Sequence, residues 1–110
     1  MNIVLKHLRD QVMVITGATS GIGLATARAA ARAGAKLTLA GRSENALRQI
    51  EQELRGAGCE VECVVADVGQ EGEVRKVAEA ARGRFGGFDT WVNNAGVSIY
   101  GKSLDVPVED

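Results

Sequence analysis

The stretch VMVITGATSGIGLATARAA, residues 12–30, combines three features that decide the fold. Val12–Thr16 is a short, β-branched apolar run, which is typical of a strand covered on both faces. A glycine-rich turn follows, and the alanine-rich segment from about Gly21 to Ala33 is expected to be helical. Gly34, directly after this segment, is a residue type that commonly ends helices. The stretch therefore predicts a strand that runs through a tight turn into a helix.

The same alternation of strand and helix continues along the chain. Further strands are expected at Lys36–Gly41, Val61–Ala66 and Thr90–Asn94. Helices are expected after Ser43, a residue type that caps helices, and over about Gln70–Arg84. Strands separated by single helices pair in parallel through right-handed crossovers. The pattern predicts one α/β domain over residues 1–110, a Rossmann-type, doubly wound parallel sheet with the strand order 3-2-1-4.

Each of the two later helices is expected to bury one apolar stripe. The stripe of the helix after Ser43 consists of Leu47, Ile50 and Leu54. The stripe of the next helix consists of Val74, Val77, Ala78 and Ala81. Beyond Gly96 the alternation fails, and the sequence predicts a loop with a helix that starts near Pro107.

The composition is that of an ordinary soluble globular domain and argues against several classes of function. The chain has 110 residues, 45% of them hydrophobic and 25% charged, with a formal net charge of −1. This charge gives no electrostatic reason to expect nucleic acid or an acidic membrane surface as a partner. No apolar run is long enough to cross a bilayer, and residues 1–11 lack the features of a signal peptide. A cytoplasmic protein is therefore expected.

The two cysteines, Cys59 and Cys63, are expected to be buried and reduced. If residues 59–67 form a strand, the two lie on one face about 13 Å apart, too far for a disulfide. The single histidine, His7, is remote in sequence, so no zinc ligand set is present and no metal site is predicted.

The turn TGATSGIG, residues 16–23, has a spacing of glycines that suits the binding of a phosphate. Gly17 permits a tight exit from the strand, Gly21 allows close approach of a pyrophosphate, and Gly23 allows close packing of the helix. The start of the following helix offers unpaired N–H groups and a partial positive charge. No lysine follows Gly21, as a P-loop would require. A glycine turn needed only for packing is the alternative interpretation.

This turn resembles the TGxxxGxG motif of the short-chain dehydrogenase/reductase family. Three further matches stand at the family's intervals: Gly41-Arg42, Asp67-Val68 and Asn93-Asn94-Ala95-Gly96. The resemblance covers nearly all of the chain. It implies the N-terminal, NAD(P)-binding part of an oxidoreductase that interconverts an alcohol and a carbonyl by hydride transfer.

The resemblance also implies the positions of the cofactor site. Asp67 would accept a hydrogen bond from the adenine amino group with Val68 beside the ring, although an aspartate can simply end a strand. Asn94, Ala95 and Gly96 would lie under the adenosine ribose. The expected cofactor-binding residues are Gly17, Thr19, Ser20, Gly21, Ile22, Gly23, Arg42, Ser43, Asp67, Val68, Asn94, Ala95 and Gly96.

The end of the second predicted strand favours NADP over NAD. The acid that commonly binds the ribose hydroxyls is replaced there by Gly41, and Arg42 follows it. An arginine can hold a 2′-phosphate through charge-assisted hydrogen bonds. Many NADP-dependent relatives also carry a basic residue where this chain has Ser20. In the alternative interpretation Arg42 is a solvated charge and Ser43 a helix cap.

No catalytic residue is predicted within the chain. The family's acid is a tyrosine with a lysine four positions later, whereas Tyr100 is followed at that distance by Leu104. We therefore expect the 110-residue chain to be inactive alone and the parent protein to act as a homo-oligomer on a small-molecule alcohol or carbonyl. A non-catalytic dinucleotide-binding module, acting as a sensor or scaffold, is the alternative, and a methyltransferase fits less well. The fourth strand would lie at an open edge, through which the fragment could self-associate.

Overall fold

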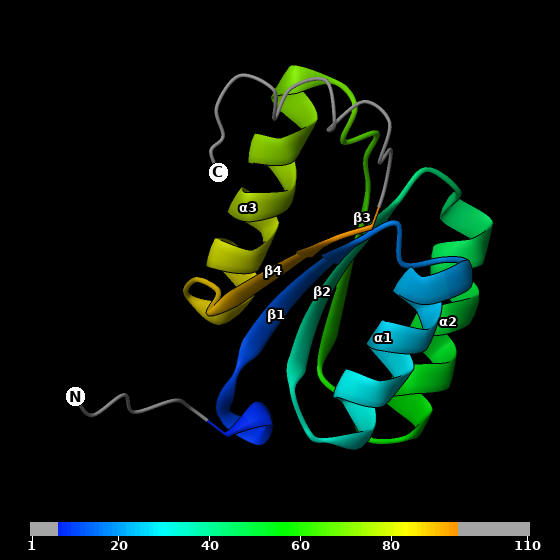
Figure 1. Cartoon of the computed structure of the whole chain (residues 1–110), viewed down its shortest axis with the longest axis vertical. Coiled ribbons are helices and arrows are strands. Elements are labelled where there is room, and N and C mark those ends of the chain that lie inside the picture. Colours follow the sequence, from blue (N-terminus) through cyan, green and yellow to red (C-terminus); the bar gives the residue numbers. More distant parts are fainter. Residues whose placement is uncertain (1–6, 95–110) are drawn as a thin grey trace.

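The computed structural model of the chain describes residues 7–94 and consists of one sheet with three helices packed on it (Figure 1). The elements in chain order are η1 (Leu8–Asp10), β1 (Val12–Thr16), α1 (Gly21–Arg32), β2 (Lys36–Gly41), α2 (Glu44–Gly56), β3 (Val61–Val65), α3 (Glu71–Phe85) and β4 (Thr90–Asn93). The element η1 was not predicted, and the bounds of all the other elements lie within one or two residues of the predicted ones. The loop and helix predicted beyond Gly96 lie outside the described residues.

The four strands pair in parallel in the order β3-β2-β1-β4, which confirms the predicted doubly wound topology. The register places Val14 of β1 opposite Thr38 of β2 and Trp91 of β4. Because all strands are parallel, their carboxyl ends meet at one edge of the sheet, where α1 also begins (Figure 1). This edge therefore collects the four loops that follow the strands.

Alternate strand residues point to opposite faces of the sheet and build two separate cores. One face, with Ile15, Leu37 and Leu39 among its fully buried residues, is covered by α1 and α2 (Figure 1). The other face, which includes Val14, Ala40 and Val64, packs against Val77 and Ala81 of α3. Burial on both faces explains why Val12–Thr16 reads as a continuous apolar run rather than as an alternating one.

The stripe predicted for α3 is only partly buried. Val77 and Ala81 are buried, as predicted, but Ala78 is only half-buried and Val74 is 38% exposed, so the prediction for these two was wrong. On an ideal helix Ala78 lies on the flank of a line through Val77 and Ala81. Within residues 7–94 no second helix lies beside α3 on its face of the sheet, so the sides and the first turns of α3 stay accessible.

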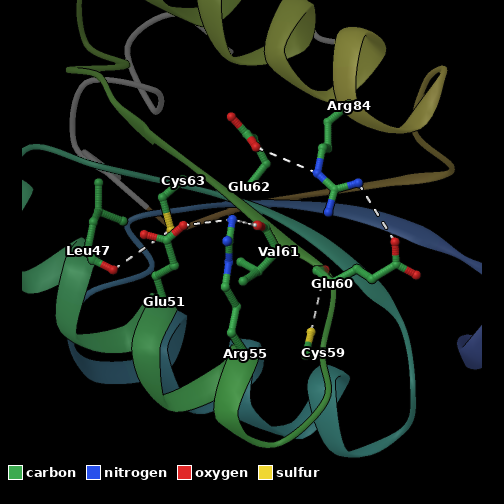
Figure 2. A network of polar contacts seen from close by, with 9 residues as sticks. All are labelled: Leu47, Glu51, Arg55, Cys59, Glu60, Val61, Glu62, Cys63 and Arg84. Carbon is green, nitrogen blue, oxygen red and sulfur yellow. Dashed lines mark hydrogen bonds and ion pairs between the residues drawn. The ribbon is translucent and has the colours of Figure 1, made fainter.

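The two cysteines are free thiols, but each is half-buried rather than fully buried as predicted. Cys59 precedes β3, where its Sγ donates a hydrogen bond to the Ala35 carbonyl oxygen, so the two cysteines do not share one strand. Cys63 lies within β3, and its Sγ points toward the Leu47 carbonyl oxygen of α2 (Figure 2). Burial, reinforced by the nearby Glu51, raises the pKa of the Cys63 thiol to about 12. Cys63 is therefore a protonated, unreactive thiol at neutral pH.

The outer strand β3 is held by cationic side chains from both faces of the sheet. From α2, Arg55 donates to the Val61 carbonyl oxygen at 3.0 Å, and from α3, Lys76 donates to the Val65 carbonyl oxygen at 2.7 Å. Arg84 also lies 3.7 Å from Glu60 and 3.8 Å from Glu62 (Figure 2). Backbone acceptors at a sheet edge invite another strand, and charged side chains oppose such pairing. Both ends of β3 are protected in this way.

Within residues 7–94, no helix has both the length and the apolar content that a bilayer crossing requires.

Candidate functional site

A cavity of about 600 Å³ opens at the carboxyl ends of the strands. Its walls come from the β1–α1 turn, the ends of β2 and β3, and the residue after β4. The lining residues are Gly17, Thr19, Ser20, Gly21, Ile22, Gly23, Ala40, Gly41, Arg42, Ser43, Ala66, Asp67, Val68, Gly69 and Asn94. Every predicted site residue that the structure describes is among them, and Ala95 and Gly96 lie outside the described residues. The structure thus gathers residues from four separate loops around one cavity.

The glycine turn depends on backbone conformations and contacts that other residues tolerate poorly. Gly17 and Gly21 have φ angles of 64° and 57°, in the left-handed region that favours glycine. A Cβ on Gly23 would lie 1.9 Å from the Gly17 carbonyl oxygen, so only glycine lets α1 begin this close to the turn. A Cβ on Gly21 would meet nothing within 4 Å, because this position faces open space.

The first turn of α1 has no side-chain cap from Ser20, the residue at its N-cap position. Ser20 occupies the N-cap position with an extended backbone, but its hydroxyl makes no capping hydrogen bond. The first turn also contains no acidic residue. Unpaired N–H groups at a helix start carry a partial positive charge and favour an anion. Ser20 and Gly21 both line the cavity, so this positive end of α1 faces it.

Ile22 adds an apolar contact surface beside this helix start. It lines the cavity and is 76% exposed, the largest exposure among the large apolar side chains that the structure describes. A strongly exposed aliphatic side chain at a concave site is a typical ligand contact.

A threonine hydroxyl connects the end of β1 to the end of β4, next to Asn94 in the cavity wall. The buried Thr16 Oγ1 donates to Asn93 Oδ1 at 2.8 Å and accepts a hydrogen bond from the Asn94 backbone N–H at 3.2 Å. Asn94 is thereby fixed in the cavity wall. Its Nδ2 is buried and has no hydrogen-bond partner among the described residues. Buried polar atoms are normally paired, so Asn94 has a donor available for a ligand.

Asp67 has a local structural role at the end of β3. Its Oδ1 accepts a hydrogen bond from the Gly69 backbone N–H at 3.0 Å, and its own N–H donates to Glu73 Oε1 at 3.0 Å. These contacts shape the loop before α3, as expected for an aspartate that ends a strand. Since Oδ2 has no partner within residues 7–94, one carboxylate oxygen is still available at the cavity.

Arg42 and Ser43 follow β2 but have different local roles. Ser43 Oγ accepts a hydrogen bond from the Ala46 backbone N–H at 3.2 Å and caps α2. Arg42 is exposed at the cavity and forms no ion pair with any residue in the described part of the chain. Its guanidinium group is thus the cation available to an anion bound there.

Four lining residues were not among the predicted site residues: Ala40, Gly41, Ala66 and Gly69. They are the last residues of β2 and the residues that flank Asp67-Val68 after β3. Because carboxyl ends of parallel strands meet at one edge, their positions at predicted strand ends were the signal that could have identified them.

Comparison with known proteins places this site in a family. The sequence family described as short chain dehydrogenase matches residues 11–110. The oxidoreductase YxnA of Bacillus subtilis, which is uncharacterized, is 57% identical over 106 residues, covering 96% of this chain and 30% of that protein. The chain therefore belongs to the short-chain dehydrogenase family, of which the predicted motifs are characteristic.

Solved structures agree with this assignment. A short-chain dehydrogenase/reductase of Burkholderia phymatum, in complex with NAD, matches 79% of this chain and 31% of its own at 40% identity and a TM-score of 0.76. A short chain oxidoreductase of Pseudomonas aeruginosa, with NADPH bound, matches 80% of this chain and 35% of its own at 39% identity and a TM-score of 0.76. The chain spans about a third of the length of these relatives.

Proposed function

We propose that this chain is the dinucleotide-binding domain, residues 1–110, of an NADP-dependent oxidoreductase that interconverts an alcohol and a carbonyl. The observation that carries the proposal is the cavity at the strand ends, which is lined by the uncapped start of α1 and by the exposed Arg42. One end of this cavity suits a pyrophosphate and the other suits a further phosphate. Membership of the short-chain dehydrogenase family supports hydride transfer as the reaction.

The residues present fit a nicotinamide dinucleotide. Gly21, Ile22 and the start of α1 would hold the pyrophosphate, with no Cβ in its way. Asp67 and Val68 would hold the adenine, and Asn94 Nδ2, which has no partner within residues 7–94, would donate to the ribose side. Ala95 and Gly96 are proposed to lie under the ribose. When bound, such a cofactor supplies or accepts the hydride, while the residues of this chain bind and orient it.

NADP is proposed over NAD because of the charge at the end of β2. Relatives solved with NAD and with NADPH both exist, so family membership leaves the choice open. Arg42 forms no ion pair with a residue in the range 7–94, and Gly41 places no carboxylate at the end of β2. A carboxylate there would repel a 2′-phosphate, whereas a guanidinium group binds it. The acid that protonates the substrate oxygen is not assigned to this chain, and the parent protein is proposed to act as a homo-oligomer.

Titration calorimetry of the full-length protein with NADPH and NADH tests this function. We expect NADPH to bind more tightly, and Arg42→Ala to weaken NADPH binding by about tenfold or more while NADH binding is unchanged. Arg48→Ala is the matched control, because Arg48 lies on α2 outside the cavity and pairs with Glu44. If neither nucleotide binds, the proposed function is overturned. If both bind equally tightly, the NADP preference is overturned.

A further inference from the structure

Gly41, the last residue of β2, lies in a tightly packed place, although its backbone conformation does not require a glycine. It is buried, and it is not among the glycines with positive φ, so any residue could adopt its conformation. A Cβ built on Gly41 would lie 3.2 Å from Thr19 Cγ2, 3.5 Å from Thr19 Oγ1 and 3.7 Å from Leu47 Cδ2. The nearest obstacle to a side chain at position 41 is therefore the side chain of Thr19.

The position of Thr19 is fixed by the fold. The preceding residue, Ala18, is fully buried, and its N–H donates to the Ala40 carbonyl oxygen at 3.1 Å. This hydrogen bond ties the glycine turn to the end of β2, so the turn cannot move away from Gly41 without losing it. Thr19 itself is half-buried and lines the cavity. A side chain at position 41 must therefore displace the branched end of Thr19.

We propose that Thr19 is a specificity-determining residue, which excludes an acidic side chain from position 41 and so leaves Arg42 without a carboxylate beside it at the end of β2. An acid at the end of the second strand is the usual ligand of the ribose 2′-hydroxyl. In this chain such an acid needs two changes, a carboxylate at position 41 and a smaller residue at position 19. The inference rests on the proposed dinucleotide function and explains how its selectivity is fixed.

The steric part is tested without any ligand, in a double-mutant cycle on the full-length protein. Gly41→Ala adds only the Cβ, and we expect it to lower the melting temperature. Thr19→Ala removes both of the nearest atoms. In a protein that already carries Thr19→Ala, Gly41→Ala should therefore lower the melting temperature by clearly less. Gly56→Ala is the matched control, because a Cβ there meets nothing within 4 Å. Additive effects of the two substitutions would overturn the steric contact.

The selectivity part is tested with 2′,5′-ADP and 5′-AMP, which carry the adenosine end with and without the 2′-phosphate. Gly41→Asp alone should weaken 2′,5′-ADP binding without improving 5′-AMP binding, because the carboxylate is pressed against Thr19. The double variant Thr19→Ala/Gly41→Asp should improve 5′-AMP binding by about tenfold over the single variant. Thermal unfolding of each variant shows that it is folded.

The outcomes separate this inference from the proposed function. If Gly41→Asp alone reverses the preference while the wild type prefers 2′,5′-ADP, the role of Thr19 is wrong and the dinucleotide function stands. If the folded wild type binds neither probe, the dinucleotide function fails and the selectivity role fails with it. The inference is supported if the preference for 2′,5′-ADP over 5′-AMP is reversed only in the double variant.

Discussion

Helices α1 and α2 both have a serine at the N-cap position, but only one of the two serines caps its helix. At α2, the Ser43 hydroxyl accepts the Ala46 N–H and Glu44 stands in the first turn, so the chain satisfies this end itself. At α1, the Ser20 hydroxyl makes no capping bond, no acid stands in the first turn, and the end opens on a cavity. The difference separates a helix start that stabilises the fold from one that is left available for an anion.

The largest effect is expected where α1 approaches the turn most closely. Gly23→Ala would bring a Cβ to 1.9 Å from the Gly17 carbonyl oxygen, so the start of α1 must shift. We expect a loss of about 3 kcal/mol in the free energy of unfolding, measured by urea denaturation, together with loss of nucleotide binding. Gly83→Ala, an exposed helical position with nothing within 4 Å, should be neutral or stabilising. Equal stability of the two variants would contradict the close contact.

Removing the cap of α2 should have a moderate effect. Ser43→Ala deletes the acceptor of the Ala46 N–H, and we expect it to lower the free energy of unfolding by about 1 kcal/mol. Urea denaturation measures the change, and Ser43→Asp should restore most of it because an aspartate also caps. An unchanged midpoint in Ser43→Ala would mean that α2 does not depend on this bond.

A smaller effect is expected from the ion pair that joins the two helices. Arg28 of α1 donates to both carboxylate oxygens of Glu53 of α2, and this hydrogen bonding lowers the pKa of Glu53 below its ordinary 4.5. A lowered pKa stabilises the fold above the ordinary value, and this contribution is lost as the pH falls through the folded-state pKa. Glu53→Gln should therefore lower the melting temperature slightly at neutral pH and flatten its fall below about pH 4.5.

The same melting curves provide the control for this ion pair. Glu79→Gln breaks only a long, exposed contact of 4.0 Å with Arg82, so its curve should follow the wild type. Identical acid profiles for Glu53→Gln and the wild type would contradict the contribution of the pair.

The smallest effect should come from the helix start that the chain leaves open. Ser20→Ala removes a hydroxyl that caps nothing, so the urea midpoint should stay within error of the wild type. The contrast with Ser43→Ala is the informative quantity. If Ser20→Ala lowers the free energy of unfolding as much as Ser43→Ala does, both serines cap their helices and the two helix starts do not differ.

Much of the fold could be predicted because its signals are local. The apolar runs of β1 and β2, the glycines that end the helices and the 3.6-residue stripe of Leu47, Ile50 and Leu54 follow from neighbours along the chain. The cavity could be predicted as a set of residues because parallel strands bring their carboxyl ends together. The exposure of Val74 could not be predicted from the sequence, because it depends on which helices lie beside α3.

By itself, the sequence determined the elements and their order, since periodicity is a property of a few consecutive residues. The tertiary structure alone decided that Ser20 does not cap α1, how close a Cβ on Gly23 would come to Gly17, and that the Thr19 side chain lies against Gly41. The last contact joins residues 22 positions apart in the chain, and its effect depends on a few tenths of an ångström. Such distances are set by how a turn and a strand end pack together, which no local pattern of residues encodes.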